Sequence, residues 1–242
     1  MNDAPATPEH GHSQSEVEAR IGAPNGHGYL RDTVYGAIDG AVTTFAIVAG
    51  VAGAGLSPFV VLALGIANVL ADGLSMAASN YSGTKAERDD ARRLAEVERR
   101  HLDVDPDGER REIREILRQK GLEGTVLEEA TDQIAVKREA AVRLMLTDEY
   151  GLAPLEPSPL RGALATFAAF LVAGFVPLLP FLFGVQDAFR LSAVMTGVTF
   201  FLIGAAKSLW SLSAWWRSGL ETLAIGGSAA AVAYAVGTFF AV

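Results

Sequence analysis

The sequence predicts an all-α integral membrane protein with five membrane-spanning helices and a cytoplasmic three-helix domain inserted between the second and third spans. Half of the 242 residues are hydrophobic and the mean hydropathy is +0.26, although one residue in five is charged. Charged and apolar residues occupy different stretches of the chain. Five apolar stretches approach the roughly 20 residues that a helix needs to cross a bilayer, and a soluble core of this size could not bury them all.

The five apolar segments follow one another with a single long interruption. They are predicted at about residues 33–56, 59–81, 161–183, 191–209 and 220–242. Ser57 and Pro58 form a link so short that the first two segments must make a helical hairpin. Pro177 and Pro180 should kink the end of the third. The predicted domains are a disordered tail over 1–30, two spans over 31–84, the inserted domain over 85–157, and three spans over 158–242.

Residues 85–157, called the insert below, contain 19 acidic residues and read as three helices. The first continues from the second span to about Leu102. A turn at residues 103–108 leads to a second helix over 109–120. A third helix over 125–150 is closed by Gly151.

Composition excludes several classes of function. The net charge of −8 argues against a nucleic-acid partner. The absence of cysteine excludes disulfides, thiolate metal sites and cysteine nucleophiles. The tail is rich in Pro, Gly, Ser and His, and is expected to be a flexible segment, with loose metal binding by His10 and His12 as the alternative.

The distribution of Lys and Arg predicts the orientation. Of 20 basic residues, two precede the first span, 15 lie in residues 85–161, and Lys207 and Arg217 flank the loop between the last two spans. Only Arg190 falls on the opposite side. Because basic residues favour the cytoplasm, the N-terminus and the insert should be cytoplasmic and the C-terminus outside, which suits a bacterial inner membrane.

Asp72 is a carboxylate inside an apolar span, where an unpaired charge costs several kcal/mol. A set of polar or thioether side chains follows helical spacing around it and shares one face of the second span: Asn68, Asp72, Ser75, Met76 and Ser79. Such a row suits the passage of a divalent cation. The alternative is a helix-packing face held by polar side chains.

The first span carries a matching stripe that is polar at its start and small above. It contains Asp39, Thr43, Ala46, Gly50 and Gly53. Small residues allow close approach of another backbone, so Asp39 could lie near the stripe of the second span at the cytoplasmic mouth. Equally, Asp39 could be an ordinary acidic residue near a helix start.

Three pairs in the insert project from single helix faces at helical spacing. They are Glu98 with His101, Glu109 with Glu112, and Met145 with Glu149. From spacing alone, solvated charges are the simpler interpretation. Glu98–His101 is also one copy of the Glu-x-x-His pattern of di-iron bundles, which normally use two.

Two long stretches resemble the vacuolar iron transporter family, including its nodulin-like and bacterial members. Residues 39–58 are similar to the family's first span, residues 65–76 to its second, and residues 149–152 to the end of its cytoplasmic domain. The resemblance covers about residues 30–242. It implies five membrane helices, a cytoplasmic three-helix metal-binding domain, a homodimer, and export of Fe²⁺, often with Mn²⁺ as a second substrate, in exchange for protons. No permanently bound cofactor is expected.

The resemblance also assigns roles to residues. The family's translocation aspartate falls on Asp39 and its methionine on Met76, whereas its span-two glutamate falls on Asn68. Asp72, one turn later on the same face, would supply the missing charge. The transport pathway is thus predicted to contain Asp39, Thr43, Asn68, Asp72, Ser75 and Met76.

The family's cytoplasmic metal site carries over with one substitution, because a further glutamate position is His101 here, and imidazole also binds Fe or Zn. The predicted ligands are Glu98, His101, Glu109, Glu112, Met145 and Glu149. A transporter is the preferred function. The alternatives are a membrane-tethered ferroxidase built on Glu98 and His101, and a metal sensor that does not transport.

Overall fold

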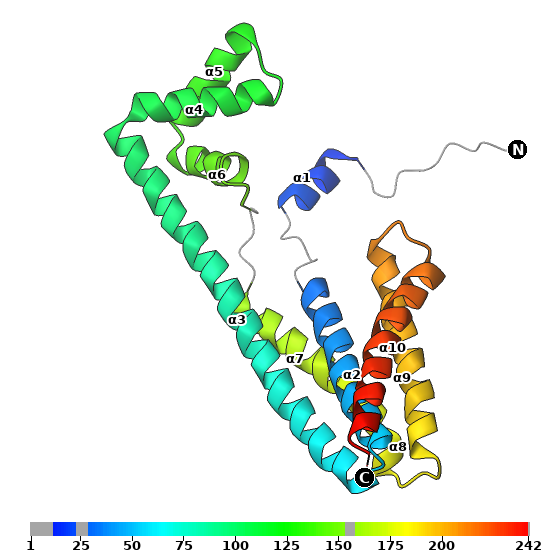
Figure 1. The fold of residues 1–242 in the computed structure, drawn as a ribbon. Helices are drawn as coiled ribbons and strands as arrows, with labels where there is room; N and C mark the ends of the chain where they lie inside the picture. The colour runs from blue at the N-terminus through cyan, green and yellow to red at the C-terminus, as the bar shows by residue number, and fades with distance from the viewer. Residues whose placement is uncertain (1–11, 23–28, 153–157, 242) are drawn as a thin grey trace, which may run out of the picture.

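The computed structural model describes residues 12–22, 29–152 and 158–241, and every regular element in these ranges is helical (Figure 1). Five helices are long and apolar enough to cross a membrane, which agrees with the predicted number. They comprise α2 (Leu30–Gly53), the first part of α3 (Pro58–Val104), α7 (Pro159–Phe175) with η1 (Val176–Leu178) and α8 (Leu179–Leu182), α9 (Ala188–Lys207) with η2 (Ser208–Trp210), and α10 (Trp215–Phe239).

Close backbone contacts hold the spans together. α7 contacts both α2 and α3, while α10 contacts both α2 and α9. Gly36 and Gly40 of α2 allow the contact between α2 and α7. A Cβ at Gly36 would collide with the Thr166 carbonyl of α7, and a Cβ at Gly40 with the Phe170 carbonyl. Small residues at such crossings are typical of membrane helices.

The predicted kink in the third span is present. α7 ends at Phe175, a 3₁₀ turn contains Pro177, and the short α8 contains Pro180. Proline lacks the backbone N–H that would continue the α-helical ladder. The buried Ser192 hydroxyl of α9 donates to the Pro177 carbonyl at 2.7 Å, and so supplies a hydrogen-bond donor to the backbone at the kink.

The outer faces of the spans are apolar and uncovered by the rest of the chain. Leu64, Leu70 and Leu74 of α3 are more than half exposed, as are Val194 and Val198 of α9. Exposed apolar faces on long helices are expected where lipid replaces water. The protein is therefore an integral membrane protein.

α3 is the dominant element, a single helix of 47 residues that begins with Pro58 in its first turn. At 1.5 Å per residue it is about 70 Å long, more than twice the thickness of a bilayer core. Its first half packs among the spans and its second half leaves them to carry the insert (Figure 1).

The remaining helices of the insert fold back on the far end of α3. They are α4 (Pro106–Gln119), α5 (Gly124–Ala135) and α6 (Arg138–Asp148). Asp105 separates α3 from α4, and its side chain accepts from the Gly108 N–H at 2.9 Å as a helix cap. The helices enclose a small apolar cluster of Ile113, Leu117, Leu127, Ala141 and Met145.

The prediction of one third helix over 125–150 is wrong. The chain breaks at Val136 and Lys137 and gives two helices, α5 and α6. A straight helix of that length would span about 39 Å and could not keep both halves on so small a core. Arg138 fixes the new direction, since its guanidinium donates to the Arg99 carbonyl and to Asp103 at the end of α3.

Part of the predicted disordered tail is also helical. α1 (Gln14–Gly22) starts at a capping box in which Ser13 and Glu16 bond each other through the Ser13 N–H and hydroxyl. His12 precedes it and is exposed. His10 and the rest of the predicted tail over 1–11 and 23–28 lie outside the described residues.

Candidate functional site

Five predicted ligands from three helices meet at the tip of α3. The turn at Asp105 reverses the chain, so that residues of α4 face the last turns of α3, and α6 closes the third side. Two groups each place one ligand atom per residue within 4.8 Å of the others: Glu98–His101–Glu109 and Glu98–Glu112–Glu149. These five residues are called the acidic cluster below: Glu98, His101, Glu109, Glu112 and Glu149.

Two members of the acidic cluster are buried carboxylates with spare hydrogen-bonding capacity. Glu98 is 1% exposed and Glu109 is 3% exposed, and the Oε2 atom of each has no hydrogen-bond partner among the described residues. Glu98 Oε1 accepts from the Tyr150 hydroxyl at 2.8 Å. His101 Nδ1 lies 3.4 Å from Glu109 Oε1. Because buried charges are normally paired, unpartnered oxygens facing one another fit a cation.

Burial and mutual repulsion raise the pKa values of carboxyl groups in the acidic cluster. Burial, together with the charges of Glu112, Glu98 and Glu149, raises the pKa of Glu109 from 4.5 to about 7. Burial and then Glu112 and Glu98 also raise the pKa of Glu149. The hydrogen bond to Glu98 raises the pKa of Tyr150 and keeps that phenol protonated. A divalent cation would relieve the same repulsion.

Met145, the sixth predicted ligand, has a different environment. It is completely buried and packs in the apolar cluster of the insert with Ile113 and Leu117. Packing alone accounts for a methionine at this position.

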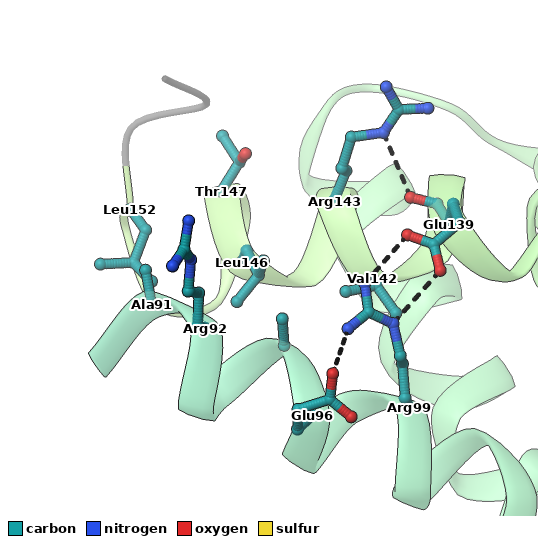
Figure 2. A pocket seen from close by; sticks show the side chains of 11 residues that line it. Ala91, Arg92, Glu96, Arg99, Glu139, Val142, Arg143, Leu146, Thr147 and Leu152 are labelled. Atoms are coloured by element: carbon teal, nitrogen blue, oxygen red, sulfur yellow. Dashed lines mark hydrogen bonds and ion pairs between the residues drawn. The ribbon is translucent and has the colours of Figure 1, made fainter. Parts of the chain in front are cut away.

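The opposite side of α6 carries a basic groove rather than ligands (Figure 2). It has a volume of about 360 Å³ and lies between α3 and α6, with no member of the acidic cluster in its lining. Arg99 spans it, donating to Glu96 at 2.6 Å and to Glu139 at 3.1 and 3.2 Å, as the dashed lines in Figure 2 show. These bonds clamp α6 to α3 and so help to place Glu149 beside Glu98.

In the membrane half, the polar residues of α2 and α3 face each other. The Asn68 amide donates to the Thr43 hydroxyl at 3.3 Å, and that hydroxyl donates to the Asp39 carbonyl at 2.8 Å. Asp39 and Asp72 are close enough for their charges to interact. The structure thus brings four of the predicted pathway residues together across two helices.

The other two pathway residues and the small part of the α2 stripe are placed differently. Ser75 is exposed and Met76 is half-buried, so this edge of α3 is not covered by the described chain. Gly53 packs against α10, where a Cβ would lie 2.5 Å from the Tyr234 carbonyl. The upper part of the α2 stripe therefore serves helix packing.

Sequence reasoning missed two residues. Tyr150 directly follows the predicted ligand Glu149, but nothing in the pattern indicates that its hydroxyl reaches Glu98. Asp32 is 8% exposed and lies in the first turn of α2, where acidic residues are common for local reasons. Its burial depends on α3 and α7, which are distant in sequence.

Comparison with known proteins agrees with this architecture. Residues 30–238 match the model of the VIT family. The chain is 34% identical over 208 residues to "Vacuolar iron transporter 1" of Arabidopsis thaliana, covering 85% of this chain and 83% of that protein. It is 34% identical over 224 residues to "Vacuolar iron transporter" of Toxoplasma gondii, covering 87% and 74%, and 29% identical over 195 residues to "Vacuolar iron transporter" of Plasmodium falciparum, covering 74% and 70%.

The match extends over all five spans and the insert, so it concerns the whole architecture rather than one motif. Members of the matched family are transporters, which removes the ferroxidase from the alternatives. The chain belongs to the VIT family of membrane transporters and is not an enzyme.

Proposed function

We propose that the protein exports divalent metal from the cytosol in exchange for protons, with Fe²⁺ as the main substrate and Mn²⁺ as a second. The names of its relatives support iron. The donors of the acidic cluster support the same class, because carboxylate and imidazole suit Fe²⁺ while carboxylate alone suits Mn²⁺. The metal is the cargo, and no resident cofactor is proposed.

One observation carries the proposal: a single helix, α3, contains residues of the acidic cluster and also the polar residues within the spans. Glu98 lies in the half of α3 beyond the spans, and Met76, Asp72 and Asn68 lie in the half within them. Glu98 and Met76 are about 33 Å apart along one continuous helix. Metal gathered by the acidic cluster would be delivered along this helix toward Asp39 and Asp72.

The path itself is proposed to form between two copies of the chain. Ser75 is exposed on the edge of α3 that its own chain leaves open, next to the half-buried Asp72 and Met76. Polar groups of this kind are costly when they face lipid. A second α3 against this edge would enclose them, which supports a homodimer.

The proposed location is a bacterial inner membrane with the N-terminus and the insert in the cytoplasm. Of the 20 basic residues, 15 lie in residues 85–161, and Lys207 and Arg217 lie near the loop between α9 and α10. The three tryptophans, Trp210, Trp215 and Trp216, gather in the same connection. Basic residues favour the cytoplasmic side, and tryptophan is typical of a membrane surface on either side.

Proton exchange is supported by the carboxylates on both parts of the route. A pKa of about 7 means that Glu109 holds a proton in part of the molecules at neutral pH, and metal must displace it. At the far end, protonation of Asp72 would neutralise a carboxylate in the membrane, release the metal and carry the proton inward.

Flux into proteoliposomes tests the proposal, with Fe²⁺, Mn²⁺, Co²⁺ and Zn²⁺ compared under an imposed pH gradient. Asp72→Asn should reduce Fe²⁺ flux at least tenfold while leaving binding by the insert intact. Asp187→Asn is the matched control, because Asp187 is an exposed carboxylate in the α8–α9 connection. Parent-level flux in Asp72→Asn would contradict the path, and metal binding without flux in the parent protein would favour the sensor.

A further inference from the structure

Asp32 is a buried carboxylate that the proposed route does not use. It is 8% exposed, and it forms no hydrogen bond or ion pair within the described part of the chain. The positive end of the α2 dipole favours an acidic residue in this first turn but does not replace a direct partner. A buried carboxylate without a partner requires another explanation.

The Asp32 side chain borders a polar cavity of about 260 Å³ between α2, α3 and α7. The donors around this cavity are two carboxylates, an amide, a thioether and four hydroxyls, two of them from Tyr35 and Ser79. The remaining donors are Asp32, Glu87, Asn80, Thr84, Thr166 and Met76. A second cavity of about 250 Å³ shares Arg31, Asp32, Thr84 and Glu87 and extends to Gly162 at the start of α7. Oxygen donors predominate at both, which suits a hard or borderline cation.

The Asn80 amide is held with its oxygen available as an acceptor. Its Nδ2 donates to Thr166 Oγ1 at 2.6 Å, and its Oδ1 accepts from Thr84 Oγ1 at 3.1 Å. Because Nδ2 is used on the α7 side, Oδ1 can contribute a second lone pair to a cation.

Gly162 leaves room between the two oxygens. A Cβ at Gly162 would lie 2.9 Å from Asp32 Oδ2 and 3.7 Å from Asn80 Oδ1, so both oxygens border the same point on α7. Any larger residue would press on the carboxylate. Gly162 therefore provides room at the mouth of the cavity and also lets α7 lie close to Asp32 of α2.

Arg31 is the one cationic residue in the lining of this cavity, and within the described part of the chain it forms no ion pair with Asp32. The Arg31 guanidinium lies over the ring of Tyr35, another lining residue, with Cζ 5.9 Å from the ring centroid. Glu87 adds a second carboxylate, so the lining holds two acidic side chains and one basic side chain. The cavity thus combines a buried carboxylate without an ion-pair partner, fixed oxygen donors and a lining with net negative charge.

We propose that Asp32 and Asn80, with Thr84 and Met76 beside them, bind one divalent transition-metal ion in each chain. In transport, this site would hold the ion between the acidic cluster and the Asp39–Asp72 pair, and that role rests on the proposed function. The binding of metal at the site does not depend on it. Asp32 lies two helical turns, about 10 Å, before Asp39 on the same face of α2, which places the site between the acidic cluster and the Asp39–Asp72 pair along the helix.

Titration of the full-length protein in detergent with Mn²⁺ alone, followed by electron paramagnetic resonance, tests the site without any gradient or flux. Asp32→Asn should remove one bound Mn²⁺ per chain and leave the ions of the acidic cluster in place. Asp187→Asn should remove none. An Asp32→Asn protein that keeps every Mn²⁺ with affinities within twofold of the parent overturns the proposal.

Two further variants keep the test decisive if Asp32→Asn does not fold. Asn80→Asp adds a carboxylate to the same cavity and should bind this Mn²⁺ at least tenfold more tightly. Gly162→Ala changes no charge and should weaken the same ion at least tenfold. If neither variant moves the affinity, the site does not exist. Absence of flux in liposomes with this Mn²⁺ still bound would reject the transport proposal alone.

Discussion

Glu109→Gln should make the metal-free insert more stable at pH 8 while weakening its metal binding. Glu109 is 3% exposed and faces three other carboxylates, which together with burial raise its pKa from 4.5 to about 7. At 1.36 kcal/mol per pKa unit, keeping this group ionised in the folded state costs up to about 3 kcal/mol. Glutamine has the same shape without the charge.

The sign of the pH dependence follows from the raised pKa. Below about pH 4.5 the carboxyl is protonated in both the folded and unfolded states, so its contribution to stability is fully present. As the pH rises through about 7, the folded protein must give up that proton and the contribution is lost. The gain from Glu109→Gln should therefore be about 2–3 kcal/mol at pH 8 and below about 1 kcal/mol at pH 5.

Hydrogen exchange of the full metal-free chain measures this effect, using amides near the completely buried Ile113 of α4 to report the opening free energy of the insert. Glu129→Gln is the matched control, since Glu129 is an exposed glutamate on α5. Equal changes at pH 5 and pH 8, or a loss of stability at pH 8, would refute the reasoning. Mn²⁺ affinity should fall at least tenfold in the same variant.

Three other outcomes are expected. Tyr150→Phe removes the hydrogen bond to the buried Glu98 carboxylate and should lower the insert's opening free energy by about 2 kcal/mol, an effect that bound metal should partly offset. Gly40→Ala forces a Cβ against the Phe170 backbone, and should reduce thermal stability in detergent by about 1–3 kcal/mol. Arg138→Ala releases the start of α6 from α3 at a cost of about 1 kcal/mol, and should speed tryptic cleavage near the α5–α6 break, unlike Lys85→Ala on the exposed face of α3.

Features that depend on local composition could be predicted from the sequence. The five spans follow from apolar length, and the kink follows from Pro177 and Pro180, because neither requires knowledge of neighbouring helices. Helical periodicity places Thr43 and Asn68 on the polar stripes of the first and second spans, and the structure adds that these two side chains face each other.

Features that depend on contacts between residues far apart in the sequence could not be predicted. The break at Val136 and Lys137 lacks a Gly or Pro signal, and it exists because α6 packs back on α3 and is fixed there by Arg138. Burial of Asp32 needs α7, more than a hundred residues later. The helix α1 was detectable, since Ser13 and Glu16 have capping-box spacing, but the polar composition of the tail favoured disorder.

The unbroken α3 has a consequence for how the chain tolerates insertions and deletions. Because one helix carries both Asp72 and Glu98, each residue removed between Tyr81 and Ala95 shortens their separation by about 1.5 Å and rotates one relative to the other by about 100°. A single deletion would rotate the acidic cluster by about 100° around the α3 axis relative to the polar residues in the membrane. An insertion of seven residues would keep the two groups on the same side of the helix within about 20°, although farther apart along its axis. Length variation in this stretch should therefore be tolerated in steps that preserve helical phase, as in a coiled coil, and not residue by residue as in a flexible linker.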